Sequence, residues 1–310
     1  MVKSIPFGAR STADKVLAGI DLTGKRFVVT GCNSGIGFET MSALCANGAQ
    51  VLGLARSLRD AEIACAKAGP SCTPVGCDLA DLDSIAAAAG MIRALEVPLD
   101  AIVANAGIAN LPALETRYGV EMQFLVNHIG HFALVNDLSS LVRNGTGRIV
   151  IVSSSASINQ APAEGIMFDN LDGHRFYKPF TFYGQSKLAN ALFAKELSRR
   201  LGARGIAVNS LHPGATKGTG LNKNLSLPLS IAASAARLFM RSAPRGAATQ
   251  ALLAANPGVS GITGEFWSNC QIARGNPLLE DVGLAKRLWE VSEAIVAGHR
   301  TSAAKMREAA

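Results

Sequence analysis

Short apolar segments rich in β-branched residues alternate along the chain with longer stretches rich in alanine and leucine. The apolar segments occupy residues 26–30, 50–55, 73–77, 101–104, 148–153, 206–211 and 265–267. Apolar runs of this length predict strands buried on both faces, and the stretches between most of them predict helices. Strands that alternate with helices imply a parallel sheet covered on both sides, so the pattern predicts a doubly wound α/β fold.

The same pattern shows no boundary between two domains. No linker rich in proline, glycine or serine interrupts it, and no internal repeat is visible. We therefore predict one domain over residues 23–300, with an N-terminal extension at residues 1–22 and a C-terminal tail at residues 301–310. Residues 221–245 fall between two predicted strands and contain many apolar side chains, so we expect them to form a lid over a substrate.

Composition favours a soluble globular protein. Of the 310 residues, 48% are hydrophobic and 17% are charged, which is enough for a sizeable core and does not suggest disorder. No apolar run reaches the roughly 20 residues of a membrane span, and residues 1–8 lack the apolar centre of a signal peptide. We expect a cytoplasmic protein without an integral membrane segment.

Cysteines, histidines and net charge suggest neither a disulfide scaffold, nor a metal site, nor a nucleic-acid partner. The six cysteines are sparse and form no Cys-x-x-Cys, so we expect reduced thiols at Cys32, Cys45, Cys65, Cys72, Cys77 and Cys270. His128 and His131 have helical spacing but no third ligand nearby, so packing or hydrogen bonding is expected rather than metal binding. The net charge of +7 is dispersed, with no basic run interleaved with aromatics.

Tyr183 and Lys187 lie four residues apart at the start of an apolar stretch that predicts a buried helix. This spacing places both side chains on one helical face, within reach of the same small volume. They could form an acid/base pair. Alternatively, Tyr183 is a half-buried aromatic and Lys187 extends to solvent. The spacing by itself does not decide between these interpretations.

A glycine-rich segment follows the first predicted strand and precedes an alanine-rich helix. It reads Gly31-Cys32-Asn33-Ser34-Gly35-Ile36-Gly37. Glycines allow a tight turn and close approach to a pyrophosphate, and the amides of the helix N-terminus favour negative charge. Asn105-Ala106-Gly107 supplies another close turn after the fourth strand, at the edge of the sheet where ligands bind in such folds. The sequence therefore predicts a dinucleotide site.

Taken together and in order, these motifs resemble the short-chain dehydrogenase/reductase family over about residues 20–295. The resemblance is carried by Thr30-Gly31-x-x-x-Gly35-x-Gly37, Asn105-Ala106-Gly107, Ser153-Ser154, Tyr183-x-x-x-Lys187 and Pro213-Gly214. Asn127-His128-x-Gly130-His131-Phe132 and Leu288-Trp289-Glu290 resemble the branch that contains retinol dehydrogenases and the WW-domain oxidoreductase. The resemblance implies a single-domain Rossmann fold and an oxidoreductase.

The resemblance also implies roles for individual residues. The catalytic set is Asn127, Ser154, Tyr183 and Lys187. The pattern of three consecutive serines does not show which one is catalytic, and the resemblance places the catalytic serine at Ser154. The cofactor set is Gly31, Asn33, Ser34, Gly35, Ile36, Gly37, Arg56, Ser57, Asp78, Leu79, Asn105, Ala106, Gly107, Tyr183, Lys187, Pro213, Gly214 and Thr216. An extra residue before the usual threonine leaves Thr216 and Thr219 as alternatives for the nicotinamide contact.

Chemistry explains why the tyrosine needs the lysine. Tyrosine has an ordinary pKa near ~10 and is a poor base at neutral pH. We expect Lys187 to stabilise the phenolate and to lower that pKa. By resemblance, the lysine would also hold the nicotinamide ribose.

The end of the second predicted strand indicates which nicotinamide cofactor is used. NAD enzymes usually place an acidic side chain there for the ribose hydroxyls, whereas this chain has Arg56, followed by Ser57. A guanidinium can bind a 2′-phosphate, with Ser57 as a second donor, so we predict NADP(H). The alternative is that Arg56 is a solvated turn residue.

The substrate is less defined. Phe176, Tyr177, Phe180 and Phe182, with residues 221–245, could form an apolar wall, or they could be core residues. The first interpretation favours a lipophilic alcohol or carbonyl as substrate. A protein of another class, a catalytically silent regulatory or scaffold protein that binds the cofactor, is the alternative. By resemblance, we expect a homodimer or homotetramer with the helices of Asn127 and Tyr183 at the interface.

Overall fold

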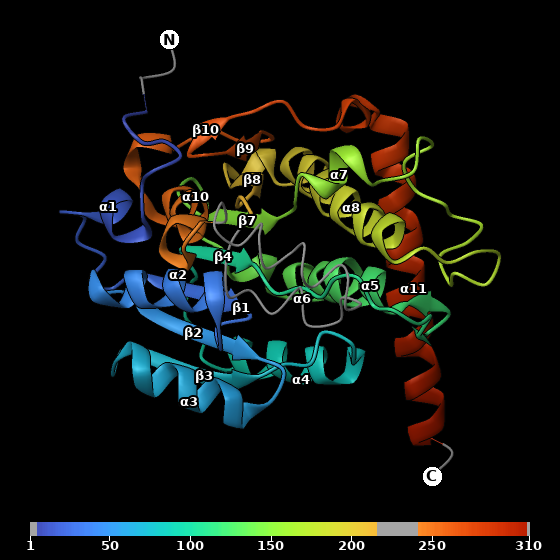
Figure 1. Ribbon diagram of the computed structural model, residues 1–310. Helices are drawn as coiled ribbons and strands as arrows, with labels where there is room; N and C mark the ends of the chain where they lie inside the picture. Colours follow the sequence, from blue (N-terminus) through green and yellow to red (C-terminus); the bar gives the residue numbers. More distant parts are fainter. Residues whose placement is uncertain (1–4, 216–240, 309–310) are drawn as a thin grey trace.

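The computed structural model describes residues 5–215 and 241–308 of the chain, and its centre is an eight-stranded sheet (Figure 1). The strand order is β10-β9-β8-β7-β4-β1-β2-β3, and every pairing except that of β9 with β10 is parallel. The strands are β1 (Arg26–Thr30), β2 (Gln50–Ala55), β3 (Cys72–Gly76), β4 (Ala101–Ala104), β7 (Arg148–Val152), β8 (Ala207–His212), β9 (Phe266–Ser268) and β10 (Gln271–Ile272).

Helices cover both faces of this sheet and build two apolar cores. The helices of one face are α1 (Ala13–Leu17), α2 (Gly35–Ala46), α3 (Leu58–Ala68) and α10 (Ala243–Ala255). On the other face lie α4 (Leu82–Arg93), α5 (Met122–Phe124), the π-helix η1 (Leu125–Ile129), α6 (Gly130–Leu138), α7 (Ala156–Asn159), α8 (Pro179–Arg200) and α11 (Val282–Glu308). The predicted doubly wound Rossmann fold is therefore confirmed.

The topology decides where a ligand can bind. From β1 the chain runs outward to β2 and β3, and then crosses back to β4, which pairs with the opposite side of β1. In open parallel sheets, ligands bind beyond the carboxyl ends of the strands at such a reversal of strand order. The glycine-rich segment follows β1, and Asn105-Ala106-Gly107 follows β4, so both flank this point.

The seven predicted strands all exist, with ends that differ by at most one residue. The prediction missed β10 and the hairpin of β5 (Thr116–Arg117) and β6 (Val120–Glu121). Each of these strands has only two residues, and two residues are too few to show a pattern of apolar and polar positions.

The two ends of the chain pack on opposite faces. In the predicted N-terminal extension, α1 buries Ala13, Val16 and Leu17 in the core shared with α10, and Asn256 donates to the Val16 carbonyl at 2.6 Å. The predicted tail from residue 301 begins inside α11, which continues to Glu308. The predicted lid, residues 221–245, lies outside the described residues up to residue 240. In the described ranges no helix is long and apolar enough to cross a bilayer.

The long helix α11 fills the surface that we predicted to be a subunit interface. It runs along the side of the molecule across α8 and α6 (Figure 1), where Trp289 contacts Phe132 and Phe193. Every residue of α8 from Gly184 to Ala194 is buried within the single chain. This stretch leaves no apolar face for a partner, so an interface at these helices would have to use residues outside it, and the interface stays a prediction.

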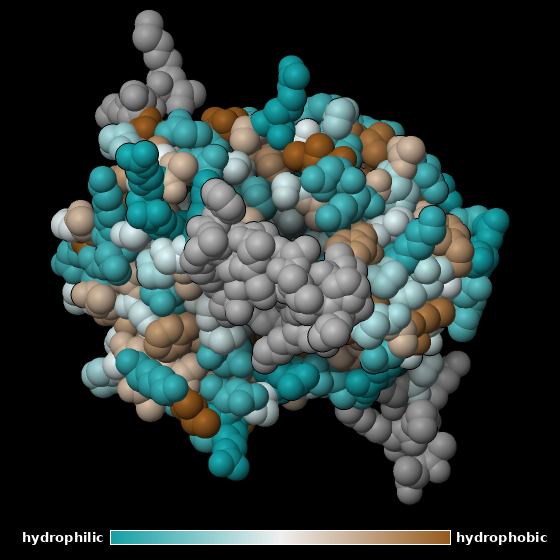
Figure 2. All heavy atoms as spheres, in the orientation of Figure 1, coloured by the Kyte–Doolittle hydropathy of each residue, from teal (hydrophilic) through white to brown (hydrophobic). Residues whose placement is uncertain are grey.

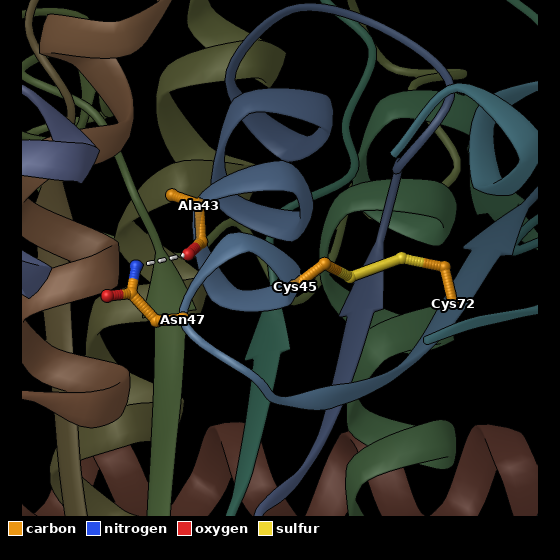
Figure 3. The surroundings of a disulfide bond; sticks show 4 residues. All are labelled: Ala43, Cys45, Asn47 and Cys72. Atoms are coloured by element: carbon orange, nitrogen blue, oxygen red, sulfur yellow. Dashed lines mark hydrogen bonds between the residues drawn. A yellow bond between two sulfur atoms is a disulfide. The ribbon is translucent and has the colours of Figure 1, made fainter. Parts of the chain in front are cut away.

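One cysteine pair departs from the sequence prediction. Cys45, near the end of α2, is joined to Cys72, the first residue of β3, in a disulfide (Figure 3). The two Cα atoms lie 6.8 Å apart, within the range that a disulfide spans. The prediction of six reduced thiols was therefore wrong for this pair, whereas Cys32, Cys65, Cys77 and Cys270 are free and buried.

Candidate active site

A cavity of about 980 Å³ opens at the carboxyl ends of β1, β2, β4, β7 and β8. Its glycine-loop end is lined by Gly31, Asn33, Ser34, Ile36, Gly37, Arg56, Asp60, Asp78, Leu79, Asn105, Ala106 and Gly107. Its reaction end is lined by Ser153, Ser154, Tyr183, Lys187, His212, Pro213 and Gly214. The structure therefore brings most of the predicted cofactor and catalytic residues to one continuous space.

The turns after β1 and β4 pack against each other so closely that there is no room for a side chain at Gly31 or Gly37. A Cβ atom on Gly37 would lie 2.2 Å from the Gly31 carbonyl oxygen, and one on Gly31 would lie 3.0 Å from the Ala106 Cα. Asn105 fixes this contact, because its Nδ2 donates to the Thr30 carbonyl at 2.8 Å. Backbone is thus exposed to the cavity beside the N-terminus of α2, which is what binding a pyrophosphate requires.

Tyr183 and Lys187 occupy successive turns of α8. Lys187 is only 3% exposed, which excludes the interpretation of a lysine that extends to solvent. Its Nζ lies 5.9 Å from the centre of the Tyr183 ring and donates to the Val152 carbonyl at 3.3 Å. A buried ammonium beside a phenol in a cavity is unusual for a purely structural pair, so the acid/base interpretation is favoured.

The three consecutive serines, Ser153, Ser154 and Ser155, differ in their hydrogen-bond partners. Ser153 is buried and donates to the Lys187 carbonyl at 2.6 Å, so its hydroxyl proton is used in positioning α8. Ser154 forms a hydrogen bond with Tyr183. Ser155 lines the cavity, and its backbone amide donates to His212 Nδ1 at 3.1 Å. Only Ser154 therefore joins the tyrosine, as the resemblance implied.

Burial, and not Lys187, dominates the pKa of Tyr183. Burial raises the pKa of this phenol above its ordinary value, and the hydrogen bond with Ser154 offsets the rise only in part. Burial lowers the pKa of Lys187 to about 8. The predicted lowering of the tyrosine pKa was therefore wrong for this structure. Tyr183 is protonated at neutral pH, which suits a proton donor.

Asn127 lies in the π-helical turn η1, behind the cavity wall, and is fully buried. Its side chain accepts from the Ile108 amide at 2.8 Å and donates to the Ile108 carbonyl and to Ser186 Oγ, both at 2.9 Å. A Cβ atom on Gly107 would lie 3.0 Å from Asn127 Oδ1 and 3.1 Å from Lys187 Nζ. Asn127 thus holds the loop after β4 against α8, next to the lysine.

The two histidines of η1 and α6 have hydrogen-bonding roles. His131 connects Thr30 Oγ1 to the Asn127 carbonyl, with both contacts at 2.9 Å, and burial lowers its pKa to about 4. Thr30 Oγ1 already accepts from the amides of Asn105 and Ala106, so its proton points to His131 Nε2. The His131 proton therefore lies on Nδ1. His128 Nε2 pairs with Ser292 of α11 at 2.8 Å.

Comparison with known proteins is consistent with this geometry. A family model described as short chain dehydrogenase matches residues 25–167. Human retinol dehydrogenase 14 is 35% identical over 295 residues, covering 88% of this chain and 86% of that protein. Human WW domain-containing oxidoreductase is 35% identical over 301 residues, covering 94% of this chain and 72% of that protein. Short-chain dehydrogenase TIC 32 B, chloroplastic, of Brassica napus is 34% identical over 304 residues, covering 94% of each chain.

The chain belongs to the short-chain dehydrogenase family. Members of this family are oxidoreductases that bind a nicotinamide cofactor, and relatives named retinol dehydrogenase and WW domain-containing oxidoreductase place this chain near their branch, as predicted. A solved short chain dehydrogenase from Burkholderia cenocepacia in complex with NADP has a TM-score of 0.63 and 26% identity, covering 79% of this chain and 96% of that one.

In this short-chain dehydrogenase the described residues fit such a cofactor. The exposed backbone around Gly31 and Gly37 can receive a pyrophosphate, and Lys187 and Tyr183 line the cavity at its other end. Pro213 and Gly214 also line it, whereas Thr216 and Thr219 lie outside the described residues, so the choice between them stays open. Of the other predicted cofactor residues, Gly35 and Ser57 do not reach the described cavity wall.

The predicted aromatic wall does not line the described cavity. Phe182 is a core residue with no exposed surface, and Phe176 and Phe180 are 45% and 42% exposed. Tyr177 donates to the Leu111 carbonyl at 2.7 Å. The substrate side is formed instead by Ile108, Ala109, Leu111, Glu115, Met122, Val126, Ala156 and Gln160. Its floor is apolar, as expected, but it comes from the loop after β4, from α5 and from η1.

The sequence prediction missed several polar residues of the cavity, among them Asp60, Glu115, Gln160 and His212. His212 precedes Pro213 and is neutral at physiological pH, because burial lowers its pKa to about 4, assisted by the charge of Arg241. Its Nδ1 accepts the hydrogen bond from the Ser155 amide, so the single ring proton lies on Nε2. For Asp60 the sequence held one signal, since Ser57-x-x-Asp60 has the spacing of a helix cap.

Proposed function

We propose that this chain is an NADP(H)-dependent oxidoreductase of a lipophilic alcohol or carbonyl compound, with Tyr183 as the general acid/base. The observation that carries the proposal is one cavity that begins at Arg56 and ends at Tyr183, Ser154 and Lys187. A cofactor adenosine would lie near Arg56, and the substrate would lie between Tyr183 and the apolar floor of Met122 and Val126.

The chemistry divides between the cofactor and the chain. When bound, the nicotinamide supplies or accepts the hydride. Ser154 donates a hydrogen bond to the substrate oxygen and stabilises the charge that develops on it. Tyr183 delivers its phenolic proton to that oxygen in reduction and accepts it in oxidation. By family resemblance, Lys187 binds the nicotinamide ribose, while Asn127 holds the adjoining loop and joins the proton path.

A silent regulatory or scaffold protein is the competing function. Such a protein needs a cofactor site but has no use for a proton donor. Tyr183, protonated and hydrogen-bonded to a serine inside the cavity, therefore favours an enzyme. The buried Lys187 also favours an enzyme. Burying its charge lowers the stability of the fold, so we infer that the lysine is retained for a function.

A spectrophotometric screen tests the proposal. We expect absorbance changes at the nicotinamide band when the protein is mixed with NADPH and apolar aldehydes or ketones, or with NADP⁺ and apolar alcohols. Tyr183→Phe is the matched negative control. Cofactor binding without turnover on any member of a broad panel would support the scaffold function instead.

Arg56→Ala tests the choice of cofactor. Arg56 is exposed at the glycine-loop end of the cavity, where its guanidinium can form charge-assisted hydrogen bonds with a 2′-phosphate. Such bonds contribute about 1.5–3 kcal/mol, so we expect kcat/KM with NADPH to fall roughly ten- to a hundredfold, with little change for NADH. Wild-type values equal or better with NADH, at one salt concentration, would contradict the proposed preference.

Location and assembly remain predictions. The four buried free thiols suit the predicted cytoplasm, whereas the Cys45–Cys72 disulfide is typical of an oxidising compartment. A homodimer or homotetramer would have to use surfaces other than the buried stretch Gly184–Ala194 of α8. On the face shown in Figure 2, strongly apolar side chains are scattered in small groups among polar ones.

A further inference from the structure

The glycine-loop end of the cavity carries two opposite charges. Arg56 follows β2 and is exposed, and Asp60 lies in the first turn of α3 and is partly buried. Both side chains line the cavity. Among the ion pairs of the described residues, none joins these two. The negative charge of Asp60 is therefore not neutralised by Arg56, and it acts at the place where Arg56 would bind a phosphate.

Asp60 also withholds the hydroxyl that was expected to help Arg56. Ser57 caps α3: its Oγ accepts from the Asp60 amide at 3.1 Å and donates to Asp60 Oδ2 at 2.7 Å. A serine hydroxyl has one proton, and here the carboxylate binds it. Ser57 cannot donate to a phosphate without giving up this bond, which is consistent with its absence from the described cavity wall.

The field of Asp60 reaches the glycine-rich segment. The pKa of Cys32, between Gly31 and Asn33, is raised to about 12, first by burial, then by Cys65, with the charge of Asp60 as a smaller cause. The same field acts on any anion held beside these residues. A second negative charge near a 2′-phosphate is unfavourable, whereas a ribose hydroxyl can donate to a carboxylate.

We propose that Asp60 is a specificity-determining residue that opposes Arg56 and limits the preference of this site for a 2′-phosphate. The inference rests on the proposed function, since it assumes that the adenosine of a nicotinamide cofactor occupies this end of the cavity. Arg56 attracts the 2′-phosphate. Asp60 repels it and holds the Ser57 proton, so that NAD(H) remains usable.

Calorimetry with nucleotide fragments tests Asp60 without catalysis. The full chain is titrated with adenosine 2′,5′-bisphosphate and, separately, with adenosine 5′-diphosphate. We expect Asp60→Asn to bind the 2′,5′-bisphosphate about three- to tenfold more tightly, because one negative charge is removed while an oxygen still accepts from Ser57. Affinity for the 5′-diphosphate should change less than about twofold, and the gain should shrink at high salt.

Glu62→Gln is the matched control. It removes one negative charge from the same helix, two residues further on, where Glu62 is exposed outside the described wall of this cavity. If Asp60→Asn gains no more affinity for the 2′,5′-bisphosphate than Glu62→Gln, the inference is overturned. Should Asp60→Asn fold poorly, Asp60→Ser makes the same charge change and also keeps an oxygen acceptor for Ser57.

The two proposals fail in different ways. If Arg56→Ala binds both fragments like the wild type, the NADP(H) assignment is wrong, yet the comparison of Asp60→Asn with Glu62→Gln can still be made. If Arg56→Ala loses the 2′,5′-bisphosphate and Asp60→Asn leaves its affinity unchanged, the assignment of the cofactor survives and the role of Asp60 is refuted.

Discussion

Tyr183→Phe is expected to abolish measurable turnover. The substitution removes the phenolic oxygen that bonds to Ser154 and leaves the ring in place. General acid/base catalysis contributes typically about 10²- to 10⁴-fold, and no other phenol lines the described cavity, so we expect a loss of kcat at the upper end of that range. Cofactor affinity, measured by quenching of protein fluorescence, should stay nearly unchanged.

Tyr177→Phe provides the control for this experiment. It also removes a phenolic oxygen, but one that donates to the Leu111 carbonyl outside the described reaction end. Loss of activity in Tyr183→Phe alone would assign the effect to proton transfer. Near-normal kcat in Tyr183→Phe would refute the acid/base assignment.

Lys187→Met should lower activity and raise thermal stability at the same time. Loss of the ammonium removes the positive charge beside Tyr183 and, by resemblance, a ribose contact, so kcat and cofactor affinity should each fall at least about tenfold. Thermal stability should rise in Lys187→Met, because the wild-type fold buries a charge unfavourably. Burial lowers the pKa of Lys187 to about 8 from its ordinary 10.5. Asn190 still donates to the Val152 carbonyl at 3.1 Å after the lysine is gone.

The sign of this stability effect depends on pH. Between about pH 8 and 10.5 the unfolded chain binds the lysine proton and the folded chain has released it, so Lys187 makes wild-type stability rise with pH there. Below about pH 8 Lys187 is charged in both the folded and the unfolded chain, and the full free-energy cost of burying its ammonium lowers the stability of the fold. The melting temperature of Lys187→Met should therefore exceed that of the wild type most clearly at neutral pH, and the difference should shrink as pH rises. Lys195→Met, at a partly exposed lysine paired with Glu280, should show no such trend.

Local pattern predicted most of the fold. The strands at 26–30, 50–55 and 101–104 were located to the residue, because each is a short apolar run between clear breaks. The pair of two-residue strands around Tyr118 and the edge strand β10 were missed, since they form through pairing and not through periodicity. The fold class needed only the alternation of strands and helices, which fixes a parallel sheet.

The candidate site divides in a similar way. Gly31, Gly37, Tyr183 and Lys187 were found because their spacing encodes a local geometry, a tight turn or one face of a helix. The predicted aromatic wall was wrong, because a phenylalanine in the first turns of a helix, such as Phe182 in α8, gives no local sign of whether it faces a cavity or the core.

By itself, the sequence determined the positions of the strands along the chain, the dinucleotide turn and the tyrosine–lysine pair, since each depends on residues within a few positions of one another. Only the tertiary structure decided which distant residues meet. It joined Cys45 to Cys72 across 27 positions, laid α11 over α8, and set Asp60 beside the same cavity as Arg56. It also reversed the expected direction of the Tyr183 pKa, because desolvation depends on everything that surrounds a group and not on its neighbours in the chain.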